Sequence, residues 1–328
     1  MKKTCMLLAF VLNATIVICQ SISPEYSMLI KKADSLYQLK EYEKSALSYS
    51  EAFKTIGWKG LPNDRFNAAC TWALSNNPDS AFFNLNRIAT KSNYSDLDHI
   101  IKDQDLTSLH NDNRWKLLID LIKQNKEKSE INLNKPLAAQ LDSIYNDDQK
   151  YRREISEIEN KYGWDSKEMK NHWKIIQEKD SINLIKVSSI LDKYGWLGVD
   201  VIGQNGNNAL FLVIQHSDLT TQEKYLPMMR DAVKIGKANS SSLALLEDRV
   251  ALRQGKRQIY GSQIARDPET QIHYVLPLDD PDNVDKRRAE VGLEPLANYV
   301  IRWQIKWDIE QYKKDLPAIE AKEKTRQK

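Results

Sequence analysis

Residues 42–52 read YEKSALSYSEA, and residues 78–88, which lie 36 positions later, read PDSAFFNLNRI. Over residues 26–90 the same spacing aligns further positions, and most of these are small or apolar in both copies. The matched pairs are Ala33 and Ala69, Ser45 and Ala81, Tyr49 and Leu85, and Ala52 and Ile88. A period of this length is typical of stacked pairs of helices, in which small residues lie where two helices cross closely. The repeat therefore predicts a helical-repeat module in the N-terminal third.

The first unit, which contains Ala33, Leu36, Tyr42, Ser45, Tyr49 and Ala52, resembles the tetratricopeptide repeat. The resemblance implies a solenoid over residues 20–123, whose concave face would bind a protein or peptide partner. Residues 97–109 are interpreted as a half-repeat, and the segment that begins at Arg114 as a capping helix. The repeat pattern describes packing, so it does not identify the ligand.

The N-terminus has the layout of a secretory signal peptide. Lys2 and Lys3 precede an apolar run over residues 6–18, and Cys19 precedes polar chain. Such a leader is removed on export, so residues 1–19 are expected to be cleaved and the protein to be periplasmic or extracellular. Residues 16–19 also form a distorted lipobox, so a lipoprotein anchored at Cys19 is the alternative, and an uncleaved anchor is a third. No later segment approaches the ~20 apolar residues of a transmembrane helix.

The amino-acid composition excludes several classes of protein. The chain of 328 residues is 41% hydrophobic and 28% charged, which is typical of a folded protein and not of a collagen-like or disordered one. Its formal charge of +3 includes Lys2 and Lys3 of the leader, so little positive charge remains and no nucleic-acid partner is expected. Cys70 would be alone in the mature chain, where a thiol within a small-residue stretch is expected to pack as a small hydrophobe.

A polar stretch over residues 124–136 predicts a linker to a second domain over residues 137–312. There, helical periodicity and Gly-Trp caps predict helices up to Tyr162 and from 166 to 194, followed by helices over 209–214 and 240–254. Two β-prone stretches, 258–264 and 272–276, predict a hairpin. Pro295 is expected to open the last helix, and residues 313–328 to form a charged, fraying tail. The predicted fold class is mainly α, a tetratricopeptide-like module followed by a mostly helical domain with one small β-hairpin.

The helix over residues 240–254 places charges in unusual surroundings. Asp248 shares a stripe with Ala244 and Ala251, and Arg249 shares the neighbouring stripe with Leu245 and Leu252. Adjacent residues of a helix point about 100° apart, so the two charges do not simply neutralise each other. Each therefore needs a partner elsewhere in the fold.

Five short motifs follow one another in the second domain: QHSD at 215–218, LEDRV at 246–250, GKRQIYGSQ at 255–263, VDKRR at 284–288 and GL at 292–293. Together they resemble an uncharacterised bacterial domain family, domain of unknown function 6624. Ser262 stands where that family usually has threonine, which keeps the hydroxyl group. The resemblance implies a cluster of polar positions and no established activity.

The polar residues of these motifs suit an acid–base site. His216 would be the base, Asp248 would hold its other ring nitrogen, and Gln263 or Arg288 would bind an anionic or amide group. The candidate catalytic residues are His216, Asp248, Tyr260 and Gln263, and the candidate binding residues are Arg249, Gln258, Arg287 and Arg288. The alternative is a buried ion network that fixes the hairpin, with His216 as a satisfied core histidine. HExxH, GxSxG and paired CxxC motifs are absent from the sequence, so no metal and no cofactor are expected.

Two functions remain open at this point. One is a protein-binding or scaffolding adaptor of the cell envelope that uses its helical repeats. The other is a hydrolase acting on an envelope peptide or glycan through the cluster around His216. The sequence indicates neither a substrate nor an oligomeric state.

Export can be tested directly. The protein recovered from the periplasm or the medium is expected to begin at Gln20, because the leader ends at Cys19. Intact-mass spectrometry measures this. A mass that corresponds to a diacylated Cys19 would identify the lipoprotein instead, and a retained Met1 would contradict cleavage.

Overall fold

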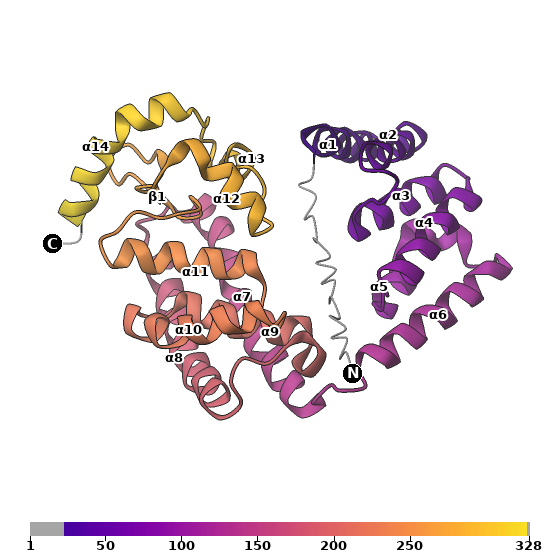
Figure 1. Ribbon diagram of the computed structural model, residues 1–328, viewed down its shortest axis with the longest axis horizontal. Coiled ribbons are helices and arrows are strands. Elements are labelled where there is room, and N and C mark those ends of the chain that lie inside the picture. Colours follow the sequence, from indigo (N-terminus) through magenta and orange to yellow (C-terminus); the bar gives the residue numbers. More distant parts are fainter. Residues whose placement is uncertain (1–22, 327–328) are drawn as a thin grey trace, which may run out of the picture.

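The computed structural model describes residues 23–326, so the predicted signal peptide lies outside the described residues (Figure 1). The protein is mainly helical with one small antiparallel sheet, which confirms the predicted fold class. Residues 24–129 form one lobe and residues 135–326 form the other. Within the described chain, no helix has both the length and the hydropathy that a membrane span requires.

The N-terminal lobe begins with four helices that pack in chain order. They are α1 (Pro24–Gln38), α2 (Tyr42–Thr55), α3 (Pro62–Leu74) and α4 (Pro78–Lys91). Three of them begin at proline, which lacks the N–H that the first helical turn leaves unpaired anyway. Ala33, Ala52 and Ala81 are fully buried where the helices meet. The 36-residue period thus corresponds to successive helix pairs, as the small residues predict.

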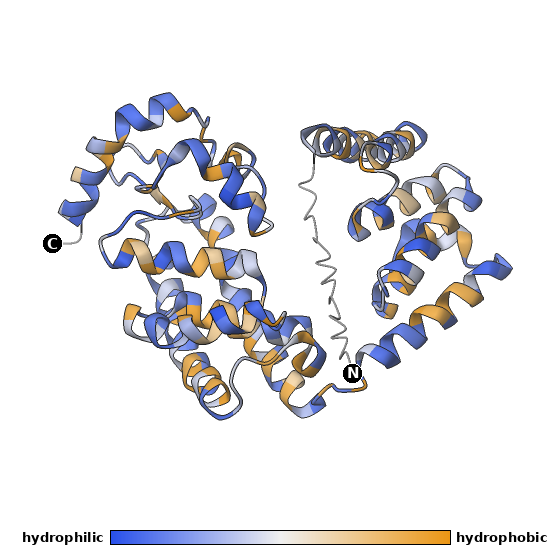
Figure 2. Cartoon of the chain, in the orientation of Figure 1, coloured by the Kyte–Doolittle hydropathy of each residue, from blue (hydrophilic) through white to orange (hydrophobic). Residues whose placement is uncertain are grey.

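The lobe is completed by α5 (Leu97–Lys102), the 3-10 helix η1 (Gln104–Leu109) and α6 (Asn113–Ser129). The apolar residues of α6, orange in Figure 2, include Leu118 and Ile122, which are buried against the preceding helices. The buried Asn125 donates from Nδ2 to the carbonyl oxygens of Ala89 and Tyr94, at 2.8 and 3.1 Å. This helix closes the exposed end of the repeat.

The predicted linker over residues 124–136 is mostly helix, which corrects the sequence-based boundary. Residues 124–129 belong to α6, and the next helix begins at Lys135, so only residues 130–134 connect the lobes. The sequence here is polar, but Asn125 packs inward and Asn134 caps the following helix through a 3.2 Å bond from Leu137 N–H. Polar composition alone did not reveal these helix-stabilising contacts.

The core of the C-terminal lobe is a group of five helices. They are α7 (Lys135–Tyr162), α8 (Lys167–Tyr194), α9 (Val199–His216), α10 (Leu219–Lys234) and α11 (Ser240–Arg253). Gly163 and Gly195 end α7 and α8 with φ of 89° and 69°, as the Gly-Trp caps predict. The apolar run 209–214 is the buried part of α9, and it packs on α7 and α8. This apolar packing fixes how the polar ends of the helices face one another.

The predicted hairpin forms, but its first strand is shorter than expected and begins six residues later. Strand β1 (Ile264–Arg266) pairs with β2 (His273–Val275), with Ile264 opposite Val275. Residues 258–263, predicted as strand, form an irregular loop instead. The reason is that side chains, and not a neighbouring strand, bind most of its backbone N–H groups.

The C-terminal segment also differs from the prediction. After η2 (Pro281–Asn283) and α12 (Val284–Glu290), the expected single helix is divided into α13 (Leu296–Val300), η3 (Ile301–Trp303) and α14 (Ile309–Arg326). The break includes Gln304, which has a left-handed φ of 60°. Tyr299, Trp303 and Trp307, which are spaced four residues apart, are therefore not on one helix.

Residues 313–326 of the predicted fraying tail belong to the helix α14, which packs on the domain. Tyr312 is buried, and its hydroxyl accepts from Leu278 N–H at 2.8 Å and donates to the Leu276 carbonyl at 2.9 Å. Arg257 forms an ion pair with Glu320 at 2.7 Å. Charged composition suggested fraying, but these charges meet partners on the domain surface, and Tyr312 supplies an apolar anchor.

Candidate functional site

Asp248 holds the loop that precedes β1. Its carboxylate is fully buried and accepts from the backbone N–H groups of Ile259, Tyr260 and Ser262, at 2.7, 2.9 and 2.9 Å. Burial raises the pKa of Asp248, although these hydrogen bonds act in the opposite direction. The prediction that Asp248 holds the second ring nitrogen of His216 is therefore wrong, because its oxygens are occupied by the loop.

Three further candidate residues stabilise the same loop. Gln258 is fully buried, and its side-chain amide bonds to both backbone N–H and C=O of Gln263, at 2.8 and 3.1 Å. Arg287 donates to the Ile259 carbonyl at 3.0 Å. The buried Arg288 donates to the Tyr260 carbonyl at 2.6 Å. Gln258, Arg287 and Arg288, predicted as binding residues, thus act here as supports of the loop.

Arg249 and Gln263 connect the loop to the end of α9. Arg249 donates from Nε to Gln263 Oε1 at 3.1 Å and from Nη1 to the Gln215 carbonyl at 2.9 Å. Gln263 in turn donates to Ser262 Oγ at 2.9 Å. Tyr260 is half-buried, and burial raises the pKa of its phenol. Of the predicted cluster, Arg249 therefore bonds to the end of α9 that carries His216, and Gln263 is linked to it through Arg249.

The partner of His216 is Asp148, on α7. His216 Nδ1 lies 2.9 Å from Asp148 Oδ1, and a carboxylate has no proton to give, so Nδ1 is the donor. The Asp148 side chain is 1% exposed, whereas that of His216 is 19% exposed. Gln149 donates to the second Asp148 oxygen at 2.8 Å. The pair thus has a buried orienting carboxylate and a histidine that reaches the surface.

Arg152 and Asp180 extend this pair. Arg152, one helical turn after Asp148, lies 3.2 Å from Asp148 Oδ1 and donates to both oxygens of Asp180 on α8, at 2.9 and 2.7 Å. Burial acts to raise the pKa of Asp148, but the hydrogen bond and charge of His216 and the charge of Arg152 outweigh it, so the pKa lies below its ordinary value. Asp148 therefore stays ionised beside His216.

Asp148, Arg152 and Asp180 were not among the predicted site residues. A signal for the first was present in the sequence: Asp148 follows Leu141 and Ile144 at helical spacing, so an acid occupies the buried stripe of the helix. A buried acid requires a partner. The partner comes from α9, 68 residues further along the chain, and no local pattern indicates which histidine it is.

Oxygen and nitrogen atoms of Asp148, Asp180 and His216 all lie within 4.8 Å of one another, a spacing that a metal ion could use. The guanidinium group of Arg152, however, contacts both carboxylates. It supplies the positive charge that a cation would bring. The arrangement is thus a carboxylate–histidine pair supported by a guanidinium group.

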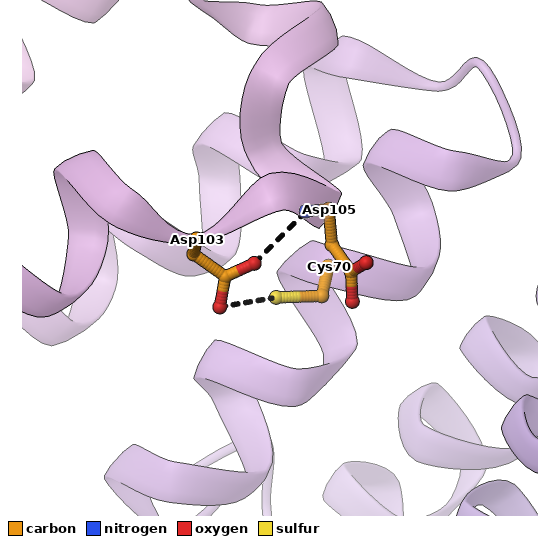
Figure 3. Close-up of side chains that lie close together, drawn as sticks. All are labelled: Cys70, Asp103 and Asp105. Carbon is orange, nitrogen blue, oxygen red and sulfur yellow. Dashed lines mark hydrogen bonds between the residues drawn. The ribbon is translucent and has the colours of Figure 1, made fainter.

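A second polar group, in the N-terminal lobe, consists of Cys70, Asp103 and Asp105 (Figure 3). The buried thiol donates to Asp103 Oδ2 at 3.9 Å. Tyr37 donates to Asp105 at 2.7 Å. Burial, followed by the charges of the two carboxylates, raises the pKa of Cys70, so the thiol stays protonated. This agrees with the expectation that Cys70 packs as a small hydrophobe.

The fold and the site define a helical protein in two lobes, whose second lobe combines a hairpin, a braced loop and a buried Asp–His pair. Residues 136–309, more than half of the chain, match the model of a family of unknown function (DUF6624). The chain belongs to this family. No family match supports the tetratricopeptide resemblance of the first lobe. No curated protein and no solved structure matches the chain.

The role of Asp248 in holding the loop predicts how two substitutions change the free energy of unfolding. Asp248→Ala removes the acceptor of three backbone N–H groups, so the free energy of unfolding is expected to fall by about 3–5 kcal/mol. His216→Ala leaves Arg152 in contact with Asp148 and should cost less than about 2 kcal/mol. Urea denaturation measures both values.

Hydrogen exchange provides the local control. In the Asp248→Ala variant, the amide hydrogens of Ile259, Tyr260 and Ser262 should exchange faster than in the parent protein. The amide hydrogens of α7 should exchange faster only to the extent that global stability falls. Equal stability of the Asp248 variant and the parent protein would contradict the assigned role.

Proposed function

We propose that the C-terminal lobe is a hydrolase in which His216 acts as general base on a peptide or glycan of the cell envelope. The supporting observation is the contact between the buried Asp148 carboxylate and His216 Nδ1. This contact orients the ring and keeps the proton on Nδ1, which leaves the lone pair on Nε2 to accept a proton. The leader sequence supports the envelope as the location.

The proposed reaction uses water as the nucleophile. Among residues 23–326, no serine, threonine or cysteine side chain is hydrogen-bonded to His216. Nε2 would take a proton from water as the water oxygen bonds to the scissile carbon. The same proton would then pass to the leaving group. Asp148 would stabilise the imidazolium that exists between these steps.

Arg152 and Asp180 support this chemistry indirectly. Arg152 holds Asp148 in its ionised form and is itself held by both oxygens of Asp180. A pair whose members come from α7 and α8 is fixed by the packing of two long helices. Rigid elements of this kind keep reacting groups in place better than loops do.

Asp147 and Asp148 provide a matched test of the hydrolase proposal. Asp148→Asn removes the charge that orients His216, and His216→Gln removes the base, so either change should lower hydrolysis by at least about 100-fold. Asp147→Asn makes the same chemical change at a surface ion pair with Lys179 and should preserve activity. The full-length protein is incubated with purified peptidoglycan and with short peptides, and products are quantified by mass spectrometry.

Two outcomes would contradict the proposal. One is the absence of products with the parent protein. The other is a product yield that is equal in the parent protein, Asp148→Asn and His216→Gln.

We also propose that the N-terminal lobe binds a peptide segment of a protein partner, which would make the chain an adaptor as well. A hollow of about 350 Å³ opens between α2, α3 and α4. Its lining residues are Ser50, Phe53, Trp58, Arg65, Trp72, Asp79, Ser80, Phe83 and Asn84. Trp58 and Phe83 are 47% and 56% exposed. Exposed aromatic side chains beside a hollow are typical anchors of protein interfaces, and the tetratricopeptide resemblance agrees with this use.

The hollow suits a peptide that inserts an apolar side chain beside Trp58 and Phe83. Peptides selected from a displayed library on the full-length protein should carry such a residue. Phe83→Ala should then weaken their binding at least tenfold by fluorescence polarisation. Leu117→Ala, at an exposed residue of α6 outside the hollow, should bind as the parent does. Failure to select any peptide, or equal binding by the Phe83 variant, would contradict this proposal.

A further inference from the structure

Arg249 stands beside the His216 site without an acidic partner. Within residues 23–326, no carboxylate lies within ion-pair distance of its guanidinium group. Its two hydrogen-bond acceptors, Gln263 Oε1 and the Gln215 carbonyl, are both neutral. Arg152, by contrast, contacts two carboxylates. Arg249 is therefore a positive charge that the surrounding protein solvates but does not neutralise.

The neighbouring charges make this imbalance larger. Burial and the charges of Arg253 and Arg152 lower the pKa of Arg249 to about 10, so it is still protonated at neutral pH. Arg253, one helical turn later on α11, donates to the Ser217 carbonyl at 2.6 Å and lies near the charge of Asp218. The Asp248 carboxylate is occupied by the loop. Arg249 thus has two like charges in its neighbourhood and no acid of its own.

The hydrogen bonds of Arg249 leave donors for a ligand. A guanidinium group has five N–H donors, and the two bonds formed here use Nε and one hydrogen of Nη1. The second hydrogen of Nη1 and both hydrogens of Nη2 take part in neither bond. These adjacent donors match two oxygens of a carboxylate or a phosphate. The two existing bonds also fix the plane of the group in advance.

We propose that Arg249 binds an oxyanion of the substrate beside His216. The inference rests on the hydrolase proposal and adds the substrate class: a molecule that carries a carboxylate or a phosphate close to the bond that is cleaved. Gln215, whose carbonyl orients Arg249, directly precedes His216 in α9. The residue that orients Arg249 and the proposed base are therefore adjacent in the sequence. A ligand oxyanion would neutralise the charge that the protein leaves unpaired.

The test uses inorganic phosphate and acetate as separate probes of the full-length protein, with sodium chloride at equal ionic strength as the reference. A saturable rise in Tm with one probe is expected, because a ligand that binds only the folded state stabilises it. The effective probe distinguishes a phosphate site from a carboxylate site. Arg249→Gln should weaken the apparent affinity at least tenfold. Arg257→Gln makes the same charge change at an exposed ion pair with Glu320 and should leave the affinity unchanged.

Folding of the variants is checked by circular dichroism. If Arg249→Gln does not fold, Arg249→Lys is used in its place. Lysine keeps the positive charge but lacks the paired N–H donors of a guanidinium group, so an affinity at least fivefold weaker is expected. No saturable shift with either probe, or equal affinity in the Arg249 variant that folds, overturns the proposal. The His216→Gln variant should still bind the anion, although it should not hydrolyse substrate. The anion site is therefore tested by the shift in Tm, and the hydrolase proposal is tested separately by product formation.

Discussion

The hydrogen bonds of the buried Asp248 carboxylate hold the loop over residues 258–263. The polar contacts of the C-terminal lobe around this loop depend on them. An ionised carboxylate in a protein interior is costly unless hydrogen bonds replace its hydration. Here three backbone N–H groups of one short loop donate these hydrogen bonds, and they belong to Ile259, Tyr260 and Ser262. The loop is thereby held on α11. Gly261, at φ of 69° and with a hypothetical Cβ only 3.1 Å from Leu296, allows the backbone to turn around the carboxylate.

The position of the loop then determines the position of Gln263, and Gln263 orients Arg249. Residues of the family motifs therefore divide into two groups. The first group supports the loop through hydrogen bonds to its backbone and consists of Asp248, Gln258, Arg287 and Arg288. The second group is Arg249, which donates to the carbonyl of Gln215 on α9, and His216, which follows Gln215 in that helix. A motif that contains many polar residues can thus be mostly structural.

Local patterns predicted the parts of the fold that depend on neighbours in the sequence. The 36-residue period indicated the helix pairs, and Gly163 and Gly195 indicated where long helices end. The strand over 258–264 was overestimated, because a β-prone sequence does not reveal that Asp248 binds its N–H groups. The contact that His216 makes was not predicted for the same reason. His216 was a candidate base, but its partner Asp148 lies 68 residues away and is brought to it by apolar packing.

The two halves of the candidate site are held by different physical means. Asp148, Arg152 and His216 are positioned by α7 and α9, which share the apolar core that includes Leu141, Ile144 and Leu210. Arg249 belongs to α11, but its orientation depends on a polar loop braced by hydrogen bonds. Apolar packing is nearly independent of the charge state of the surroundings, whereas a buried polar network is sensitive to the loss of any one member. The Asp148–His216 pair is therefore the half of the candidate site that depends least on the loop, and Arg249 is the half whose orientation depends on the loop.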